Sequence, residues 1–344
     1  MKNWWKNDVY LRKIPFLEKK AKMLKDIRAF FDSEGFLEVD TPALQVSPGL
    51  EVHLHAFETS FFDTDDSERK FYLHTSPEFT MKKLLAAGLP RIYQLTHCFR
   101  NNEWSQTHSP EFMMLEWYRA GENYEKLMVD AEKMIRRCFD GAGKKEAVFK
   151  GISCDVFQDF EKLTLHEAFD IYADINLDKV IDDDADPSPY LIKEEAKRIE
   201  VGTTDFDTFE DVFFKIMLDK IEPRLGAGIP TILYEYPISM AALSRPSPQN
   251  PKVAERFELY VSSLELANAF SELTDTETQR KRFENDMSLK EKIYHNRYPI
   301  DEDFMAALED MPEAAGIALG VDRLAMLIAG ADKIDDVLFA PVVY

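Results

Sequence analysis

Two short segments read as neighbouring strands and decide the fold of this chain: residues 92–100, IYQLTHCFR, and residues 111–118, EFMMLEWY. Both have strand length and β-favouring residues, and the segment between them is rich in Asn, Ser, Thr and Pro, so an antiparallel hairpin with a long loop is predicted. Alternation along the second strand places Glu116 and Tyr118 on one face and Trp117 on the other. A carboxylate and a phenol on a buried face indicate that a polar partner, such as a cationic ligand, completes it.

Composition and charge describe an enzyme-sized chain. It has 344 residues, 45% of them hydrophobic, which is enough for one large domain or two smaller ones. The formal net charge of −21 disfavours extended nucleic-acid binding, which normally needs clustered Lys and Arg. The cysteines lack the paired spacing of a zinc site or a disulfide framework, as expected in a reducing compartment. No signal peptide or membrane-spanning segment is predicted, so we expect a cytoplasmic protein with no membrane partner.

The rest of the chain alternates between helical and strand patterns. Helices are predicted at residues 15–31, 76–87 (with Ser76 as N-cap), 124–139 and after a capping box at 274–277. Strands are predicted at residues 36–39, 53–62, 231–234 and 256–270. Residues 141–228 carry helices separated by acidic loops, and we interpret them as an insertion or helical subdomain.

The segment 316–323, GIALGVDR, is the last chemical signature. Gly316, Ala318 and Gly320 alternate, which strips one strand face of large side chains and lets a flat ligand lie against the backbone. Arg323 then falls at the start of a helix, where its charge and the helix N-terminus both favour an anion. Small residues in strands more often mark tight packing, so this segment indicates a ligand site only together with other motifs.

Together these motifs resemble the second and third signature motifs of class II aminoacyl-tRNA synthetases. A strand ending in Phe-Arg, a loop, a strand with Glu-Phe and Glu-x-Tyr, and a small-residue strand running into Asp-Arg follow the order of that family. Residues 36–42, which end in proline, resemble its first motif, which lies at the dimer interface. The lysyl branch is the most similar, through TSPE at 75–78, HSPEF at 108–112, EWY at 116–118 and ELANAFSE at 265–272.

The resemblance implies an α+β fold: a class II catalytic core in which helices flank an antiparallel sheet. It implies one catalytic domain over residues 1–344, with the helical insertion at about 141–228. Lysyl-tRNA synthetases carry an anticodon-binding barrel ahead of the first motif. No such N-terminal barrel is expected here, because the first motif begins at about residue 36.

The chain therefore resembles truncated paralogues of the lysyl branch, which are ligases that attach a lysine-type amino acid to a lysine of elongation factor P. Ala318 stands where lysyl-tRNA synthetases generally have glycine, which is a second mark of those paralogues and implies a preference for (R)-β-lysine over lysine. Elongation factor P resembles tRNA in shape, which would let one core serve a protein acceptor. A homodimer is also implied.

On the nucleotide side, the resemblance implies a site that forms an aminoacyl-adenylate from ATP. Arg100 would bind the amino acid carboxylate and the α-phosphate, Phe112 would stack on adenine, and Arg323 would hold the far phosphates. Further implied ATP contacts are Asn102 or Glu103, His108, Gly320, Glu258 and Glu265. The last two would carry Mg²⁺.

On the amino acid side, Glu78 would receive the amino group near the reacting carboxylate. The distant ε-ammonium would meet a polar wall made of Glu116, Tyr118, Glu272 and Asn268. Two carboxylates around one ammonium select a lysine skeleton, since a neutral side chain would leave them buried and unpaired.

Two departures from the family pattern leave alternatives open. The family's second motif usually has a carboxylate two residues after the arginine, where this chain has Asn102, with Glu103 next. Either Glu103 takes that role through a shift of the loop, or an amide makes the contact. Glu265 and Asn268 face opposite sides of a regular strand, so both can line one site only if a bulge intervenes.

Plainer interpretations also exist. Arg100 could form an ordinary surface ion pair, Phe112 could belong to the core, and Glu258 and Glu265 could lie on a solvated strand face. Three functions remain open: a ligase acting on elongation factor P, a minimal synthetase charging tRNA through its acceptor end, and a catalytically silent regulatory paralogue. Retention of the arginines and of both glutamates favours an enzyme.

Overall fold

The computed structural model describes residues 3–184, 186–241 and 243–342. The chain divides into two compact units, residues 1–123 with 272–344 and residues 124–271. Each unit combines helices with mostly antiparallel strands, so the predicted α+β class is confirmed. A single domain over residues 1–344 stays a prediction. None of the helices in the described residues is both long and apolar enough to cross a bilayer.

The first unit is built on the predicted hairpin. Strands β5 (Arg91–Phe99) and β6 (Glu111–Ala120) pair antiparallel, with Leu95 opposite Leu115. Strand β13 (Ala314–Gly320) pairs antiparallel with β6, and short β1 (Leu37–Glu38) pairs parallel with β5. The strand order in this unit is therefore β1-β5-β6-β13.

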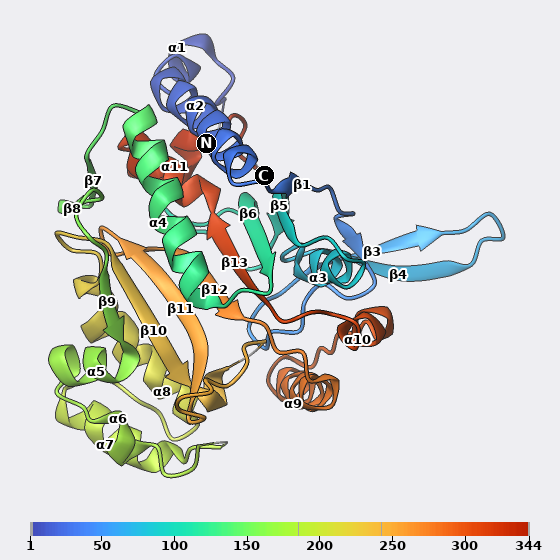
Figure 1. Ribbon diagram of the computed structural model, residues 1–344, viewed down its shortest axis with the longest axis vertical. Helices are drawn as coiled ribbons and strands as arrows, with labels where there is room; N and C mark the ends of the chain where they lie inside the picture. The colour runs from blue at the N-terminus through green and yellow to red at the C-terminus, as the bar shows by residue number, and fades with distance from the viewer. Residues whose placement is uncertain (1–2, 185, 242, 343–344) are drawn as a thin grey trace. The chain divides into compact units, whose positions relative to one another are not determined.

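Helix α2 (Ile14–Ser33) covers the apolar face of this sheet. Phe31 stacks on Tyr93 with ring centroids 4.5 Å apart and meets Trp117 at 5.3 Å. Helix α11 (Val321–Ala329) lies beside α2 (Figure 1). The predicted division of β6 into a core face and a polar face is thus confirmed, because Trp117 is fully buried in aromatic packing.

The other elements of this unit surround the sheet. They are helices α1 (Asn7–Tyr10), α3 (Glu78–Ala86), α9 (Thr276–Tyr294), α10 (Glu302–Leu308) and the 3-10 helix η4 (Ile334–Val337), with strands β2 (Leu44–Gln45), β3 (Phe57–Phe62) and β4 (Glu68–Leu73). Strands β3 and β4 form a hairpin that extends away from the rest of the unit (Figure 1).

Several predicted boundaries are wrong in detail, and the predicted strand at residues 256–270 is in fact two strands, Val253–Val261 and Leu264–Ser271. Helix α3 begins at Glu78, because Pro77 takes the cap position, although Ser76 Oγ still accepts from the Glu78 amide at 3.3 Å. Helix α9 is capped by Asp275, which accepts from the Thr278 amide at 2.8 Å, and not by a box at residue 274. Strand β3 starts only at residue 57, because before it the Leu54 carbonyl accepts from a lysine side chain and His55 forms no more than an isolated bridge with Asn101.

The second unit has its own antiparallel strands, β12 (Leu264–Ser271), β11 (Val253–Val261) and β10 (Thr231–Pro237), with β9 (Glu161–Thr164) parallel to β10. Helices α4 (Tyr124–Gly141) and α5 (Leu165–Ala173) pack on these strands (Figure 1). The remaining elements are α6 (Leu177–Val180), α7 (Pro189–Arg198), α8 (Phe209–Ile216), the short helices η1 (Met217–Ile221), η2 (Glu222–Arg224) and η3 (Ile238–Met240), and strands β7 (Glu146–Phe149) and β8 (Ile152–Asp155).

The sequence led us to expect only helices and loops in residues 141–228, but the structure also has strands there. Strands β7, β8 and β9 lie in the first part of this segment, and each has only 4 residues. Strands this short show almost no alternation, so their pattern is hidden in the sequence. The helical part follows them, and it is held by a core in which Phe169 stacks on Phe213 at 4.7 Å.

Strand β12 contains the bulge that Glu265 and Asn268 require. Its pairing with β11 runs from Leu259 opposite Ala267 to Tyr260 opposite Glu265, which leaves Leu266 without an opposing residue. The extra residue breaks the alternation of side chains between the two faces. Accordingly Glu265 and Asn268 are both half-buried, while Leu266 and Ala267 between them are buried.

Candidate active site

A cluster of buried carboxylates lies on the polar face of β6 in the first unit. Glu116 is 1% exposed and accepts a hydrogen bond from the Tyr118 hydroxyl at 3.0 Å. Glu272 is 2% exposed, and its Oε1 atom has no hydrogen-bond partner. Burial, reinforced by repulsion from Glu78, raises the pKa of Glu116 to about 8. Most of Glu116 is therefore protonated near neutral pH, and a cation at the cluster would favour its ionised form.

Lys82 joins this cluster, and sequence reasoning missed it. Its Nζ lies 2.5 Å from Glu78 Oε1 and 2.5 Å from Glu272 Oε2, and its side chain is 2% exposed. Burial alone would lower the pKa of Lys82, but Glu272 and Glu78 outweigh burial and raise it, so the lysine is charged. The signal in the sequence was the i,i+4 spacing from Glu78, which usually marks only a weak surface pair.

The cluster contains more carboxyl groups than ammonium groups. Three carboxylates, Glu78, Glu116 and Glu272, surround the single ammonium of Lys82. In the fully ionised state the excess is about two negative charges. A ligand with two ammonium groups would neutralise it, whereas a neutral ligand would leave buried carboxylates unpaired or protonated.

The small residues of β13 serve this cluster in different ways. A Cβ at Gly316 would lie 2.2 Å from Tyr118 Cε1 and 2.5 Å from Glu272 Oε1, so the space that this glycine leaves is already filled by those side chains. Ala318 stands opposite Glu116 across the strands, and its methyl group therefore shares the polar face. A Cβ at Gly320 would make only ordinary contacts with the Arg323 side chain, the nearest at 3.6 Å.

Arg100 and Phe112 lie together at the loop end of the β5–β6 hairpin. The Arg100 guanidinium carbon is 5.2 Å from the centroid of the Phe112 ring. Arg100 Nε is buried and has no hydrogen-bond partner, so a donor is available for a negatively charged oxygen. Phe112 is only half-buried, so part of its side chain remains accessible.

Arg323 and His108 form the second cationic element of the unit. Arg323 Nη2 donates to His108 Nε2 at 2.6 Å, and His108 Nδ1 lies 2.7 Å from Ser105 Oγ. Burial, followed by the charges of Arg323 and Arg100, lowers the pKa of His108 to about 4. The imidazole is therefore neutral, accepts from the guanidinium and donates from Nδ1, which orients Arg323.

The loop after Arg100 favours Glu103 over Asn102. Asn102 is exposed and has a left-handed backbone, with φ +65°. Glu103 Oε1 lies 4.0 Å from Arg100 Nη1, and its side chain is partly covered. Of the two alternatives left open by the sequence, the geometry brings the carboxylate at 103 to the arginine.

Asp322 belongs to the 316–323 segment, but the sequence predicted no role for it. Its Oδ2 accepts from the Met113 amide at 2.7 Å, and its Oδ1 pairs with buried Lys20 of helix α2. The contact fixes the start of β6 against α11, and so fixes Phe112 relative to Arg323.

The second unit holds the other predicted site residues together. Arg256 donates to Glu258 Oε1 at 2.9 Å and to Asn268 Oδ1 at 3.2 Å, and the Tyr260 hydroxyl donates to Glu258 Oε2 at 2.7 Å. Glu265 lies close enough to raise the pKa of Arg256 together with Glu258. Among the described residues no group of three or more His, Cys, Asp or Glu could enclose a metal ion. Two carboxylates do suit Mg²⁺, which completes its shell with water and phosphate oxygens.

Comparison with known proteins agrees with this arrangement. The family model of the class II tRNA synthetases (D, K and N) matches residues 11–343. The elongation factor P–(R)-β-lysine ligase of Proteus mirabilis (strain HI4320) is 39% identical over 330 residues, covering 95% of this chain and 94% of the relative. The ligase of the same name from Yersinia enterocolitica is 38% identical over 328 residues, with 95% and 94% covered. The chain therefore belongs to the class II tRNA synthetase family.

Proposed function

We propose that this chain is an ATP-dependent ligase that activates (R)-β-lysine as an aminoacyl-adenylate and transfers it to a lysine side chain of elongation factor P. One observation carries the proposal: burial raises the pKa of Glu116 and of Glu272 to about 8, and the one lysine of the cluster, Lys82, is shared with Glu78, so a cationic ligand is needed to ionise both carboxyls near neutral pH. A lysine-type amino acid brings the ammonium groups that this cluster lacks. The printed function of relatives similar along nearly the whole chain supports the same substrate and acceptor.

In the activation step, a carboxylate oxygen of the amino acid attacks the α-phosphorus of ATP, and pyrophosphate leaves. Arg100 is assigned to both reacting groups, because its buried Nε finds no hydrogen-bond partner among the described residues. Phe112 offers a ring face to adenine. Arg323, oriented by His108, holds the departing phosphates, and Glu103 and Gly320 complete the nucleotide contacts.

Substrate selection is assigned to the buried cluster. Glu116, Tyr118 and Glu272 receive the ε-ammonium, and Glu78 faces the amino group near the reacting carboxylate. In the transfer step, the amine of the acceptor lysine attacks the carbonyl carbon of the adenylate. An isopeptide bond forms, AMP leaves, and the attacking amine loses its proton.

In the second unit, Glu258 and Glu265 are assigned to Mg²⁺ and Asn268 to the polar wall. The ion, when bound, neutralises charge on phosphate oxygens. Arg256 positions Glu258 and Asn268 through its two hydrogen bonds.

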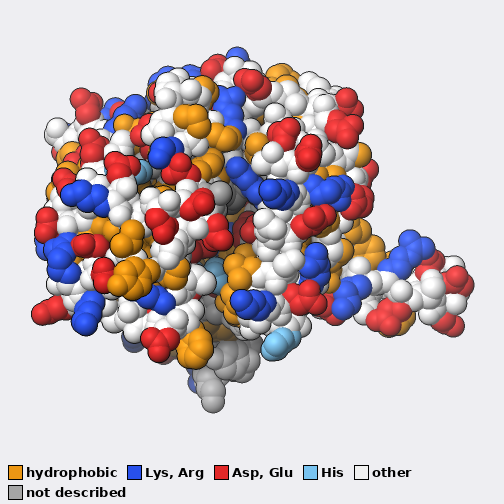
Figure 2. Space-filling model, turned by 90° about the horizontal axis from the view of Figure 1, so that it is seen from below, with side chains coloured by type: hydrophobic (Ala, Val, Ile, Leu, Met, Phe, Trp, Pro, Cys, Tyr) orange, Lys and Arg blue, Asp and Glu red, His pale blue; other side chains and the backbone are white. Residues whose placement is uncertain are grey.

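The decisive experiment is ATP–pyrophosphate exchange with lysine and (R)-β-lysine, followed by transfer of the labelled amino acid to purified elongation factor P or to tRNA. Exchange with label appearing on elongation factor P supports the proposal. Label on tRNA would identify a minimal synthetase, and absence of exchange would identify a silent paralogue. On the face shown in Figure 2, Lys and Arg side chains are interspersed with Asp and Glu, which fits a protein acceptor better than an extended nucleic-acid surface.

We also propose a cytoplasmic homodimer in which residues 36–46 meet the same segment of a second copy. Apolar side chains project from this segment, with Leu37 53%, Leu44 41% and Val46 48% exposed. Light scattering of the purified protein and of a Leu37→Asp variant tests this assignment, since a charge on an isologous interface appears twice.

A further inference from the structure

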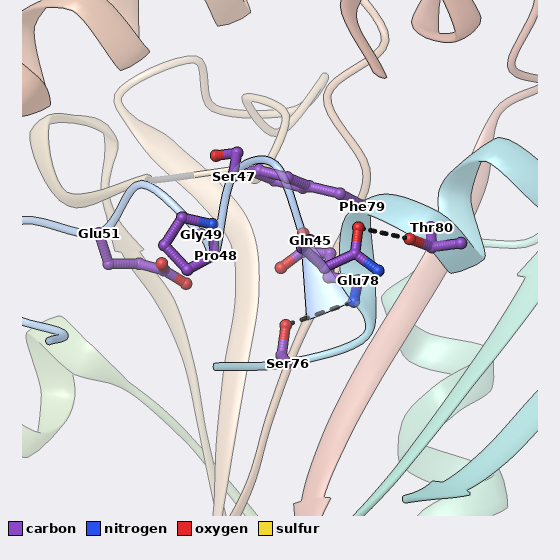
Figure 3. A pocket seen from close by; sticks show the side chains of 9 residues that line it. All are labelled: Gln45, Ser47, Pro48, Gly49, Glu51, Ser76, Glu78, Phe79 and Thr80. Atoms are coloured by element: carbon purple, nitrogen blue, oxygen red, sulfur yellow. Dashed lines mark hydrogen bonds between the residues drawn. The ribbon is translucent and has the colours of Figure 1, made fainter. Parts of the chain in front are cut away.

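One carboxylate close to the buried cluster has no role in the steps above. Glu51 lies in the irregular segment before β3 and lines a small cavity together with Gly49, Ser76 and Glu78 (Figure 3). The cavity leaves about 10 Å³ for the centre of a water-sized group. A protonated amino group is close to that size.

Glu51 lacks the counter-charge that Glu78 already has. Glu78 is paired with Lys82, whereas Glu51 Oε2 is buried with no hydrogen-bond partner in residues 3–184, 186–241 and 243–342. Lys290 donates to backbone carbonyls of this segment, at 3.3 Å to Glu51, 2.8 Å to Val52 and 2.6 Å to Leu54. An unpartnered carboxylate oxygen in a cavity is costly unless a ligand completes it.

The backbone around Glu51 is shaped to hold this side chain in place. Gly49 has φ +123°, and a Cβ there would lie 2.8 Å from Glu51 Oε2 and 2.7 Å from Thr75 Oγ1. Only glycine therefore lets the carboxylate fold back over the chain. Lys290 fixes the carbonyls of the same segment from helix α9. The conformation that brings Glu51 to the cavity is thus built by two independent elements.

Glu51 also interacts electrostatically with two residues of the proposed site, Glu78 and Arg100. Burial and then repulsion from Glu78 raise its pKa, while Arg100 and Lys290 oppose the rise. Glu51 therefore lies near the arginine assigned to the reacting carboxylate and near the glutamate assigned to the neighbouring amino group. The amino group of a substrate held by Arg100 would be within reach of this oxygen.

We infer that Glu51 is a specificity-determining residue that binds, beside Glu78, the substrate amino group closest to the reacting carboxylate. This inference rests on the proposed function. It assigns the two amino groups of the substrate to separate carboxylates: Glu51 and Glu78 for the near group, Glu116 and Glu272 for the distant one. Lys82, which pairs with Glu78 and with Glu272, then lies between the two subsites and does not contact the substrate itself.

The test compares a substrate with an analogue that lacks the near amino group. The KM of (R)-β-lysine in ATP–pyrophosphate exchange and the inhibition constant of 6-aminohexanoate are measured for the parent, Glu51→Gln and Glu51→Asp. Because Gln removes one charge-assisted contact, its KM for (R)-β-lysine should rise about 10- to 100-fold. The inhibition constant of 6-aminohexanoate should stay unchanged, and Glu51→Asp should lose less than Glu51→Gln.

The matched control is Glu58→Gln, which removes an exposed carboxylate paired with Lys70 on the β3–β4 hairpin and should change neither constant. Equal weakening of both ligands by Glu51→Gln would mean that Glu51 only supports the fold, and no weakening of either would mean that it makes no contact; both results overturn the inference while the proposed function stands. A parent without exchange for any lysine-type acid would overturn the proposed function, and the inference with it.

Discussion

Replacing Glu116 by Gln tests the charge of the pocket while keeping its shape. The interaction between a desolvated carboxylate and an ammonium is worth roughly 2–4 kcal/mol. Part of this is offset in the parent at pH 7, because the pKa of Glu116 is raised to about 8 and its ionisation there costs about 1.4 kcal/mol. The loss in kcat/KM at pH 7 should therefore correspond to about 1–3 kcal/mol, and the full value should be reached near pH 9.

The sign of the pH dependence follows from the direction of the shift. A raised carboxyl pKa means that the empty pocket favours protonated Glu116, whereas the substrate ammonium favours the ionised form. Activation by the parent should improve as the pH rises through about 8. The Gln variant stays neutral at every pH, so the ratio of parent to variant should grow about tenfold between pH 7 and pH 9.

The assay is ATP–pyrophosphate exchange with (R)-β-lysine at several pH values, together with ATP binding by calorimetry. Titration of the substrate amino groups cancels in the ratio, since parent and variant meet the same substrate. ATP affinity should not change, and Glu68→Gln, on the exposed strand β4, is the matched control. A parent-to-variant ratio that is constant over this pH range would refute the assignment of Glu116 to the ammonium.

Three further changes probe separate parts of the molecule. Ala318→Gly removes a methyl that shares the polar face with Glu116, so it should raise activation of lysine relative to (R)-β-lysine by about 1–3 kcal/mol; an unchanged ratio of the two activation rates would make Ala318 a packing residue. Glu265→Ala should reduce exchange, and added Mg²⁺ should restore it only in part, because the carboxylate orients the ion as well as binding it; an unaltered Mg²⁺ titration would remove Glu265 from the metal site. Lys290→Met leaves three backbone carbonyls without their donor, so it should lower the free energy of unfolding by about 1–3 kcal/mol in urea titrations and weaken binding of (R)-β-lysine; a stable variant with parental KM would contradict the anchoring role.

The local sequence pattern was sufficient to predict the strand that contributes side chains to both the hydrophobic core and the candidate site. Alternation along residues 111–118 separates Trp117 from Glu116 and Tyr118, and the structure keeps that separation. The need for a bulge near Glu265 could also be predicted, because residues 265 and 268 face opposite sides of a regular strand. Its position at Leu266 could not, because nothing in the residue types distinguishes a bulge from regular pairing.

Residues that act through tertiary contacts were beyond sequence reasoning. Lys82 and Glu272 are far apart along the chain, and the fold alone makes them an ion pair. Glu51 lies in an irregular segment with no periodicity, so no pattern separates it from the many surface acids of this chain. Two features of the structure single out Glu51: its carboxylate occupies the space where a Cβ at Gly49 would lie, and its Oε2 atom has no hydrogen-bond partner among the described residues.

Choice of the amino acid and choice of the acceptor are separable in this molecule. On the proposed function, the cluster around Lys82 selects the number and spacing of the substrate's ammonium groups, since each missing ammonium leaves a buried carboxylate either unpaired or protonated. None of its members is exposed: Glu116 and Glu272 are 1% and 2% accessible. An acceptor therefore meets the adenylate without touching the residues that selected it. Variants within the cluster should consequently reduce activation and transfer by the same factor, whichever macromolecule receives the amino acid.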